Sequence, residues 1–341
     1  MYKILVIQTA FIGDSILTLP MIEKLKELYH ISIIDVLAIP STKEIFESSP
    51  VVNQVYVIDK KNKQKGLFSI YKFSKELKAN NYNVIYSPHR SYRSAIITKL
   101  LNPEKSYSFS KSNFKFLYTN IVQYQKDIHE VQRNLDLISY PYDNETWKMI
   151  PKIEISKNSK NKVDEHFVNL RTEDKYAAIA PGSIWETKKY SENYFTEVIK
   201  SLVNYSFIVY LIGSKDDEKL CESILKKSGQ VVKNVAGKFS LIESIEFLKR
   251  MEILIANDSA PTHLGVCANI PVLTIYCSTV KNYGFYPYNK KSSYISYDNL
   301  SCKPCGIHGH NKCPINTFDC GNLLKPEKVI SKIKEMLNDR N

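Results

Sequence analysis

The stretch that decides the fold runs ILVIQTAFIGDSILTLPM from Ile4 to Met21. Its opening run of apolar, largely β-branched residues predicts a buried strand over Ile4–Ile7. A loop with one glycine follows, and because Pro20 is best tolerated in a first helical turn, we expect a helix to begin near Thr18. A strand that leads through a loop into a helix is typical of the βαβ units of a parallel sheet.

The same alternation continues on both sides of a polar region in the middle of the chain. Further buried strands are expected at residues 33–37, 55–58, 84–86, 176–180, 207–212, 253–256 and 272–276, with helical stretches between them. The polar region, Pro141 to Lys175, has the composition of a linker followed by one helix. The sequence therefore predicts an α/β protein of two Rossmann-like domains that face a cleft, residues 1–155 and 156–341. Ligands of such domains bind at the carboxyl ends of the strands, which suits a reaction of two substrates.

The length and composition fit two folded domains, each with a core of its own. The chain has 341 residues, of which 43% are hydrophobic and 11% aromatic, and this composition argues against disorder. Its longest apolar runs fall far short of the roughly 20 residues that span a bilayer. The run that ends at Ile7 is too short for a signal peptide. We therefore expect a cytoplasmic protein without a transmembrane helix.

The charge of the chain narrows the classes of partner. The formal net charge is +12 at pH 7, which favours phosphates, anionic lipids or nucleic acid. The lysines are scattered along the chain rather than gathered in one dominant run, which is equally typical of a solvated surface. Nucleic acid is the weakest of these options, because no recognisable nucleic-acid-binding motif accompanies the charge.

Asp14 lies in the loop that follows the first expected strand. A carboxylate there can accept a proton from an incoming hydroxyl group that lies within hydrogen-bonding reach. Gly13, beside it, permits close approach of the backbone to a ligand. Judged from this segment alone, however, a cap at the start of a helix is the better explanation of Asp14.

Two loops of the second half have the composition of phosphate sites. The first, Pro181 to Tyr190, follows a strand and offers backbone amides, the Ser183 hydroxyl and the Lys188 ammonium to an anion. The second, Ala256 to Leu264, opens a helix whose first amides and dipole would stabilise a diphosphate. An ordinary turn with exposed lysines explains the first loop as well, and a lone histidine such as His263 is more often structural.

A cysteine cluster lies near the C-terminus. Cys302, Cys305, Cys313 and Cys320 are spaced C-x2-C-x7-C-x6-C, and four thiolates can hold zinc tetrahedrally. The second pair is more widely spaced than is usual for zinc, so a structural zinc site and a cluster of reduced thiols both remain open. Elsewhere, no G-x-G-x-x-G follows the first strand and no G-x-x-x-x-G-K-[ST] is present, which counts against a nicotinamide dehydrogenase and a P-loop enzyme.

Taken together, these segments resemble a known family. Residues 8–14, 181–190 and 257–264 carry the resemblance, and residues 87–94 and 129–134 also match its pattern. They resemble the lipopolysaccharide heptosyltransferases of glycosyltransferase family 9. The matching segments occur in the right order over most of the chain, so the resemblance is more specific than any single motif.

The resemblance implies a GT-B fold, an inverting mechanism without a cofactor and usually an ADP-heptose donor. The N-terminal domain would bind an anionic glycolipid acceptor, with Asp14 as the base and Arg90 and Arg93 at its acidic groups. The C-terminal domain would bind the nucleotide sugar. The resemblance leaves open whether the last helix returns to the N-terminal domain. The donor residues implied are Ser183, Lys188, Glu243, Asp258, Ser259, Ala260 and His263. Positive charge and a helix dipole would take the place of a metal ion, and the protein would meet the inner face of the inner membrane peripherally.

The sequence departs from the family pattern in three places. Ala260 stands where glycine is usual, Tyr190-Ser191 replaces a Trp-Pro pair, and Cys277-Ser278-Thr279 replaces a Gly-Pro turn. The second change concerns packing, whereas the others concern contacts with the nucleotide. Two alternatives therefore stay open: a family member with another nucleotide-sugar donor, and a non-catalytic scaffold that binds a sugar nucleotide or zinc.

Overall fold

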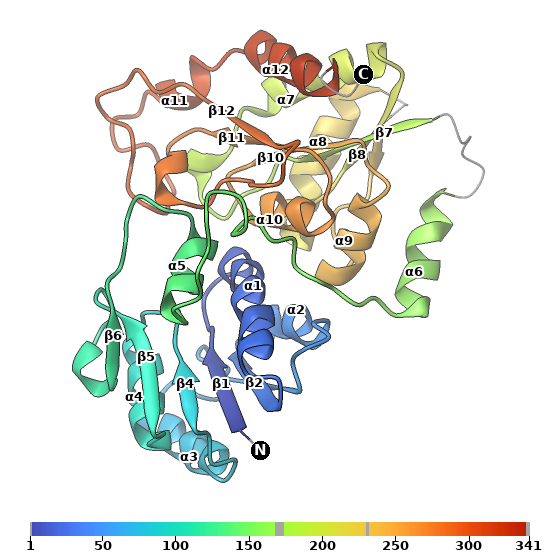
Figure 1. Ribbon diagram of the computed structural model, residues 1–341. Coiled ribbons are helices and arrows are strands. Elements are labelled where there is room, and N and C mark those ends of the chain that lie inside the picture. Colours follow the sequence, from blue (N-terminus) through green and yellow to red (C-terminus); the bar gives the residue numbers. More distant parts are fainter. Residues whose placement is uncertain (1, 168–173, 230–231, 339–341) are drawn as a thin grey trace. The chain divides into compact units, whose positions relative to one another are not determined.

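The computed structural model describes residues 2–167, 174–229 and 232–338. The chain divides into two compact units, Met1–Glu154 and Ile155–Asn341, each built around its own parallel sheet. Figure 1 labels the elements of both units, and each unit is described below by itself. Among the described residues, no helix has the length and apolar character needed to cross a bilayer.

The first unit is a six-stranded parallel sheet with helices on both faces. Its elements in chain order are β1 (Tyr2–Ile7), α1 (Ile12–Leu28), β2 (Ser32–Ala38), α2 (Lys43–Glu47), β3 (Gln54–Val57), α3 (Leu67–Lys78), β4 (Val84–Tyr86), α4 (Tyr92–Leu101), β5 (Lys105–Phe109), β6 (Asn120–Val122) and α5 (Glu130–Leu137). Helices α3 and α4 pack against one face of the sheet through residues such as Ile70 and Ile97. Helix α1 packs against α5 and α2, and the three lie together in Figure 1.

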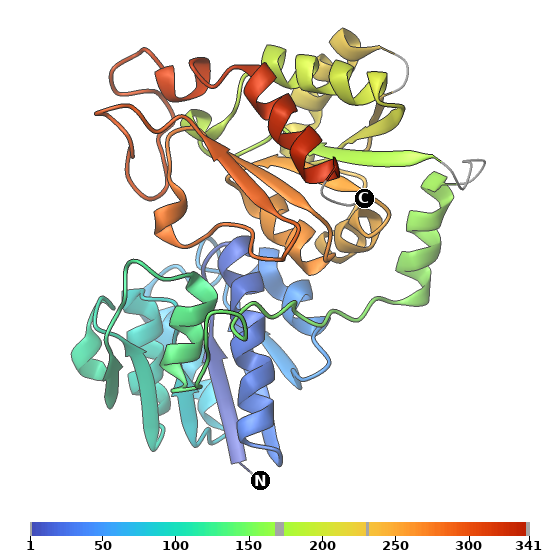
Figure 2. The same ribbon diagram turned by 45° about the horizontal axis from the view of Figure 1, so that its top comes forward.

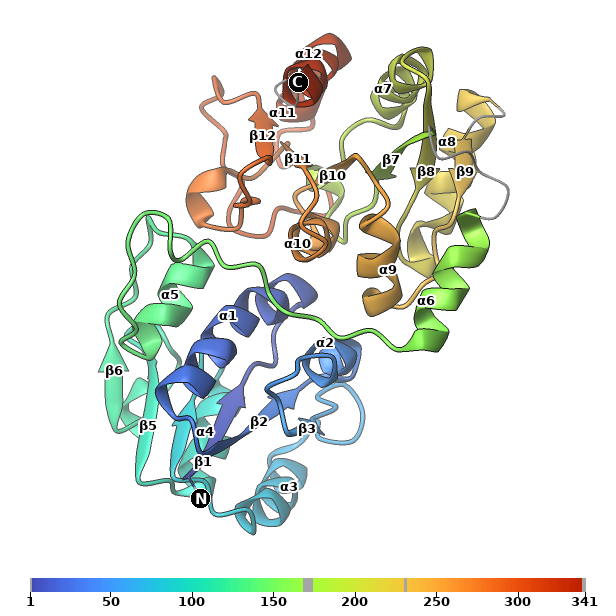
Figure 3. The ribbon, with the colours of Figure 1, turned by 45° about the vertical axis from the view of Figure 1, so that its right-hand side comes forward.

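The second unit repeats this architecture. Its elements are α6 (Lys157–Asp164), β7 (Lys175–Ala180), α7 (Glu192–Asn204), β8 (Phe207–Leu211), α8 (Glu218–Ser228), β9 (Val232–Asn234), α9 (Leu241–Leu248), β10 (Ile253–Asn257), α10 (Ala260–Cys267), β11 (Val272–Tyr276), β12 (Ser293–Ser296), α11 (Asp319–Asn322) and α12 (Pro326–Asn338). Figure 3 shows α9 and α10 on one side of this sheet and α7, α8 and α12 on the other. The predicted α/β class with two Rossmann-like units is confirmed.

The last helix belongs to the second unit. Helix α12 packs on α7 and β12, and its residues Val329, Ile333 and Met336 are buried in the core of that unit. Figure 2 shows this helix in red, on the side of the second sheet that carries α7. Helix α12 is therefore part of the core of the second unit, and a return of this helix to the first domain stays a prediction.

The strand order locates the ligand sites of both units. The first sheet runs β3-β2-β1-β4-β5-β6, and the second runs β9-β8-β7-β10-β11-β12, so the two have the same order. In each sheet the order reverses beside the first strand, between β1 and β4 and between β7 and β10. Ligands of doubly wound folds bind outside the carboxyl ends of the strands at this switch point. The loops that follow β1, β4, β7 and β10 are therefore the places where function is expected.

One expectation about the first unit is wrong. Helix α1 begins at Ile12 rather than near Thr18, and Pro20 lies inside it. Proline in a helix removes one backbone hydrogen bond and usually costs stability. Here most residues from Ser15 to Leu25 are buried, so packing outweighs the local cost. Asp14 consequently lies in the first turn of the helix, not in a long loop before it.

Candidate active site

Asp14 occupies the third position of α1, directly after the carboxyl end of β1. Phe11 is the N-cap residue, and its side chain makes no capping hydrogen bond. The Asp14 carboxylate accepts hydrogen bonds from the Phe11 amide and from its own amide. These contacts agree in part with the capping role considered from the sequence, although Asp14 is the third residue of α1 and Phe11 is its N-cap. The Asp14 carboxylate can still accept further hydrogen bonds, because an ionised carboxylate has about four acceptor sites.

The surroundings of Asp14 hold its pKa close to neutrality. Burial, followed by the charge of Glu130, raises the pKa of Asp14 to about 7, against the two amide hydrogen bonds and the charge of Arg90. A carboxyl group with such a pKa is suited to take a proton near neutral pH. The electrostatics of the first unit thus single out Asp14 as a candidate base.

Arg90 is held beside Asp14 by an aromatic ring. It follows β4, and its guanidinium lies 4.4 Å from the centroid of the Tyr124 ring. The guanidinium of Arg133 lies 5.0 Å from the same centroid, and its Nη1 is 2.6 Å from Oε2 of Glu130. Cation–π contacts of this kind orient a guanidinium without consuming its donors. Arg90 therefore keeps donors for an anionic ligand.

Basic side chains of Lys60, His89 and Arg93 lie around the loop after β1. Lys60 Nζ donates to the Thr9 carbonyl at 2.6 Å, and the Thr9 hydroxyl lies 2.7 Å from Nδ1 of His89. Burial and the charge of Arg93 lower the pKa of Lys60 to about 8. Burial and the charges of Lys60 and Arg90 lower the pKa of His89 to about 4. The Nε of Arg93 is buried and has no hydrogen-bond partner among the described residues, so this edge of the sheet is suited to an anion.

Asn257 organises the loops of the second unit. It is fully buried at the end of β10. Its Nδ2 donates to the Pro181 carbonyl at 2.7 Å, and its Oδ1 accepts from the Tyr190 amide at 3.0 Å. Both ends of the Pro181–Tyr190 loop are thereby fixed to the neighbouring strand. Tyr190 itself is buried and donates to the Leu324 carbonyl at 2.7 Å, which agrees with a packing role.

Lys188 and Asp258 meet between these loops. Lys188 Nζ lies 2.7 Å from Asp258 Oδ2, and both side chains are only 13% exposed. The Thr279 hydroxyl donates to the same carboxylate oxygen at 2.7 Å. The Asp258 amide, however, donates to the Ile275 carbonyl at 3.1 Å. The Asp258 carboxylate thus fixes the Lys188 ammonium, which retains two further donors, and the implied contact of Asp258 with the donor stays a prediction.

The other predicted donor residues lie around this ion pair. The Ser183 hydroxyl accepts a hydrogen bond from the Trp185 amide at 3.3 Å. Ser259 is the N-cap residue of α10 and Ala260 its first residue, and amides at such positions have no partner within the helix. His263 is 5% exposed and its Nδ1 has no hydrogen-bond partner in the described part of the chain. Burial lowers the pKa of His263 to about 4, with Lys188 acting in the same direction and Asp258 against it, so the ring is neutral at pH 7.

Glu243 lies elsewhere in the second unit, at the start of α9. It completes a capping box with Ser240, and its Oε2 lies 2.7 Å from Lys162 Nζ. Burial raises the pKa of Glu243, but the hydrogen bonds from Lys162 and from the Ser240 amide outweigh it, so that the pKa is lowered. These contacts give Glu243 a structural role. Its contact with a ribose stays a prediction.

The cysteine-rich segment supports the Lys188 loop. Thr187 and His310 are joined by three hydrogen bonds: the Thr187 amide and hydroxyl donate to the His310 carbonyl at 3.0 and 3.1 Å, and the His310 amide donates to the Thr187 hydroxyl at 2.8 Å. The Ser278 hydroxyl donates to that of Thr187 at 3.1 Å, and the Cys305 amide donates to the Ser278 carbonyl at 2.9 Å. The residues that replace the usual Gly-Pro turn therefore connect three loops of the site.

The cysteines of this segment, Cys302, Cys305, Cys313 and Cys320, form no disulfide. Burial together with the neighbouring Cys302 and Cys313 raises the pKa of Cys305. Within the residues that the structure describes, no three His, Cys, Asp or Glu side chains converge as metal ligands do. The structure shows the segment as a support of the Lys188 loop.

Comparison with known proteins places this arrangement in a family. The model of glycosyltransferase family 9 (heptosyltransferase) matches residues 70–313. The chain belongs to glycosyltransferase family 9.

Relatives of this family 9 glycosyltransferase are similar over the full length. Lipooligosaccharide heptosyltransferase 2 of Campylobacter jejuni is 23% identical over 341 residues, which cover 99% of each chain. The crystal structure of a family 9 glycosyltransferase from Veillonella parvula has a TM-score of 0.87 at 18% identity, covering 99% of this chain and 98% of its own. The structure of ADP-heptose LPS heptosyltransferase II from Escherichia coli has a TM-score of 0.79 at 19% identity and covers 99% of both chains. The GT-B fold expected from the sequence is thereby confirmed.

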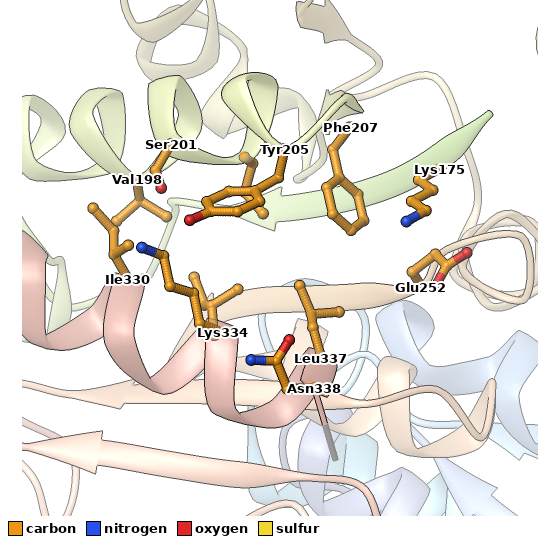
Figure 4. Close-up of a pocket in the computed structure, with 12 residues that line it drawn as sticks. Lys175, Val198, Ser201, Tyr205, Phe207, Glu252, Ile330, Lys334, Leu337 and Asn338 are labelled. Atoms are coloured by element: carbon orange, nitrogen blue, oxygen red, sulfur yellow. The ribbon is translucent and has the colours of Figure 1, made fainter. Parts of the chain in front are cut away.

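A pocket of this glycosyltransferase lies away from these loops. It has a volume of about 350 Å³ and is lined by Tyr205, Phe207 and Lys334, among others, from α7, β8 and α12. Figure 4 shows that Lys175, the first residue of β7, and Glu252, just before β10, also line it. It therefore lies at the amino ends of the strands, opposite the edge at which doubly wound folds bind their ligands. We do not assign the donor to this pocket.

Several residues that shape the site of this family 9 enzyme had no role assigned from the sequence. In the first unit these are Lys60, His89, Tyr124, Glu130 and Arg133, and in the second unit Asn257, Thr187, Ser278, Thr279 and His310. The available signal was the family pattern, because segments that match it contain His89, Glu130, Arg133, Thr187 and Asn257. Thr187 and His310 are 123 residues apart, and no local pattern predicts such a contact.

Gly309 tests the support of the Lys188 loop. Its φ is +79°, and an added Cβ would lie 2.9 Å from Thr187 Oγ1 and 3.0 Å from Ser278 Oγ. We expect Gly309→Ala to displace the loop and to raise the KM for the donor about tenfold, whereas Gly306→Ala should leave it unchanged, since small misplacements in an active site are costly. Gly306 is the matched control, because its φ is +84° but nothing lies within 4 Å of its added Cβ. Equal KM values for the two variants would contradict the proposed support.

Proposed function

We propose that this family 9 enzyme transfers heptose from ADP-heptose to an inner-core lipopolysaccharide acceptor, with inversion at the anomeric carbon and Asp14 as the base. The observation that carries the proposal is that each sheet has reactive groups at its switch point. In the first sheet this is the Asp14 carboxyl group, with a pKa of about 7. In the second sheet it is the Lys188–Asp258 pair beside the N-terminus of α10. The names of the similar proteins from Campylobacter jejuni and Escherichia coli supply the sugar and the acceptor class.

The reaction proposed is a single displacement. The acceptor hydroxyl gives its proton to the Asp14 carboxylate as its oxygen forms a bond to the anomeric carbon of the donor. On the opposite face, the bond between that carbon and the phosphate oxygen breaks, and its electron pair leaves with ADP. Attack from the face opposite the leaving group inverts the configuration.

The second unit would stabilise the departing diphosphate. Lys188 supplies a positive charge, and the amides of Ser259 and Ala260 at the start of α10 supply donors aligned with the helix dipole. The neutral His263 and the Ser183 hydroxyl complete the set. Such preorganised donors act on the charge that develops in the transition state, and the proposal includes no step through a metal ion.

Arg90 and Arg93 would bind acidic groups of the acceptor. Arg90 lies close enough to Asp14 to lower its pKa, and Arg93 lies near Lys60, which contacts the loop after β1. A guanidinium can bind a phosphate or carboxylate through two parallel hydrogen bonds. The Nε of Arg93, which has no hydrogen-bond partner in the described part of the chain, and the oriented guanidinium of Arg90 support this assignment. Lys60, beside them, adds a third positive charge.

A panel of donors tests the proposed sugar. The purified chain is incubated with a deacylated inner-core acceptor and with ADP-heptose, ADP-glucose, UDP-glucose or GDP-mannose in turn, and release of the nucleoside diphosphate is measured with and without EDTA. We expect release from ADP-heptose alone, unaffected by EDTA. Release from a different donor would favour the alternative of a family member with another nucleotide sugar.

The pH dependence of turnover tests the base. Because the base must be ionised and the pKa of Asp14 is raised to about 7, kcat/KM should fall about tenfold per pH unit below pH 7. The charge of Arg90 lowers the pKa of Asp14, so Arg90→Gln should move this acid limb to higher pH, whereas Arg93→Gln serves as the control. An acid limb near pH 4, or one that Arg90→Gln leaves in place, would speak against Asp14.

A further inference from the structure

Helix α3 of the first unit exposes apolar residues at its first turns. Leu67 is 66% exposed, Phe68 82% and Tyr71 53%. The neighbouring stripe of the helix, with Ile70, Ser74 and Leu77, is buried against the sheet. The exposed residues therefore do not serve the core of the unit. Large exposed apolar side chains that cluster on one element indicate an interaction surface.

The same segment is strongly basic. Residues 60–78 contain seven lysines and one glutamate, whereas the lysines elsewhere are scattered. Lys61, Lys63 and Lys65 are exposed in the loop that leads into α3, and Lys72 and Lys75 are exposed on the helix. A leucine and aromatic residues amid lysines are the composition with which peripheral proteins enter the interface of an anionic bilayer. A protein partner would not require this excess of a single charge.

The position of α3 relates this surface to the acceptor site. In a parallel sheet the crossover helices run against the strands, so α3 begins at the edge where β3 ends. The loop from β3 to α3 passes the loop after β1, since Lys60 Nζ donates to the Thr9 carbonyl at 2.6 Å. Leu67 and Phe68 therefore lie toward the edge of the first sheet that carries Asp14.

We propose that Lys61, Lys63, Lys65, Leu67, Phe68 and Tyr71 form a docking surface for the anionic headgroup layer of a lipid bilayer, and we call it the α3 surface. The apolar side chains enter the headgroup region and the lysines bind the lipid phosphates. This inference rests on the proposed function, because a lipid-anchored acceptor presents its sugar next to such a layer. A docked α3 surface would bring that sugar to the edge with Asp14.

Vesicle sedimentation tests the α3 surface. The full chain is mixed with vesicles of phosphatidylethanolamine and phosphatidylglycerol, or of phosphatidylcholine alone, and the bound fraction is measured. We expect binding to the anionic vesicles that declines with salt. Lys63→Gln/Lys65→Gln should weaken it roughly 30-fold, since each lysine near an anionic surface contributes about fivefold, and Leu67→Ser/Phe68→Ser should weaken it about tenfold or more.

Matched controls lie at the opposite edge of the same sheet. Ile31, just before β2, is 80% exposed, and Lys99 and Lys105 are exposed at the end of α4 and the start of β5. Ile31→Ser and Lys99→Gln/Lys105→Gln should bind vesicles as the unmodified chain does. Three results would overturn the proposal: equal binding to neutral and anionic vesicles, no binding to anionic vesicles, or equal losses of binding in the test and control variants. In each case the exposed apolar residues of α3 would instead be explained by a protein partner.

Turnover with a deacylated acceptor separates this inference from the proposed function. Variants of the α3 surface should keep the kcat of the unmodified chain on that water-soluble acceptor and lose activity only on acceptor in vesicles. Asp14→Asn should bind vesicles normally but turn over both acceptors about 10²- to 10⁴-fold more slowly. Vesicle binding without any heptosyl transfer would refute the proposed function, whereas transfer without vesicle binding would refute the docking surface alone.

Discussion

Asp14→Asn is expected to lower kcat about 10²- to 10⁴-fold, the range that a general base contributes. Asparagine keeps the shape of the side chain and an oxygen that can accept the Phe11 amide, but it cannot take a proton at neutral pH. The variant therefore retains the helix cap and removes the base. Measurement of kcat beside Asp14→Ala decides between the two roles: full activity in Asp14→Asn with loss in Asp14→Ala would show that Asp14 only caps α1.

Stability of the same variant provides an independent check. Burial raises the pKa of Asp14 from 3.8 to about 7, so the folded chain binds this proton more tightly than the unfolded chain does. The free energy of unfolding therefore falls as pH rises between about 4 and 7, and the cost persists above pH 7. Asp14→Asn should raise the Tm at pH 8 and leave it unchanged at pH 4. A lower Tm at pH 8 would contradict the assigned environment.

Lys188→Gln is expected to lower kcat/KM about 10²- to 10³-fold, because it removes a charge aimed at the departing diphosphate. The same change leaves the Asp258 carboxylate without its cation, and loss of one partner of a buried pair costs about 3–5 kcal/mol when burial is complete. The two side chains are 13% exposed, so some destabilisation is expected, and stability and turnover must be separated.

The double variant Lys188→Gln/Asp258→Asn separates them. Its two amides are neutral and can bond to one another, so the Tm should recover toward that of the unmodified chain. Turnover should remain low, since no charge is restored. Recovery of turnover together with the Tm would show that Lys188 only stabilises the loop, and would remove the donor assignment.

Most central strands and the edge strand β3 could be predicted, whereas the central strand β5 and the edge strands β6, β9 and β12 could not. Ile4–Ile7 of β1 and Val272–Tyr276 of β11 are mainly β-branched and apolar because both faces of these stretches are buried. The edge strands β6 (Asn120–Val122) and β12 (Ser293–Ser296) are short and partly polar. Only their pairing with β5 and β11 makes them strands. Pairing between distant segments is not written in a local pattern.

The site shows the same division. Asp14, Ser183 and Lys188 could be proposed because each follows a recognisable strand, and parallel strands expose such positions at one edge. The partners that set their chemistry could not. The Glu130 charge, which together with burial raises the pKa of Asp14, comes from α5. The Thr279 hydroxyl that donates to Asp258 comes from the loop that replaces the usual Gly-Pro turn of the family. Three-dimensional packing, not spacing along the chain, brings these groups together.

The configuration of the transferred sugar tests the central claim most directly. The purified chain is incubated with ADP-heptose and a deacylated inner-core acceptor in the presence of EDTA, and the product is examined by mass spectrometry and NMR. We predict an acceptor enlarged by one heptose, joined with the anomeric configuration opposite to that of the donor, and formation of this product by Asp14→Asn about 10²- to 10⁴-fold more slowly. A product that retains the donor configuration, or that Asp14→Asn forms at an undiminished rate, would contradict direct displacement with Asp14 as the base.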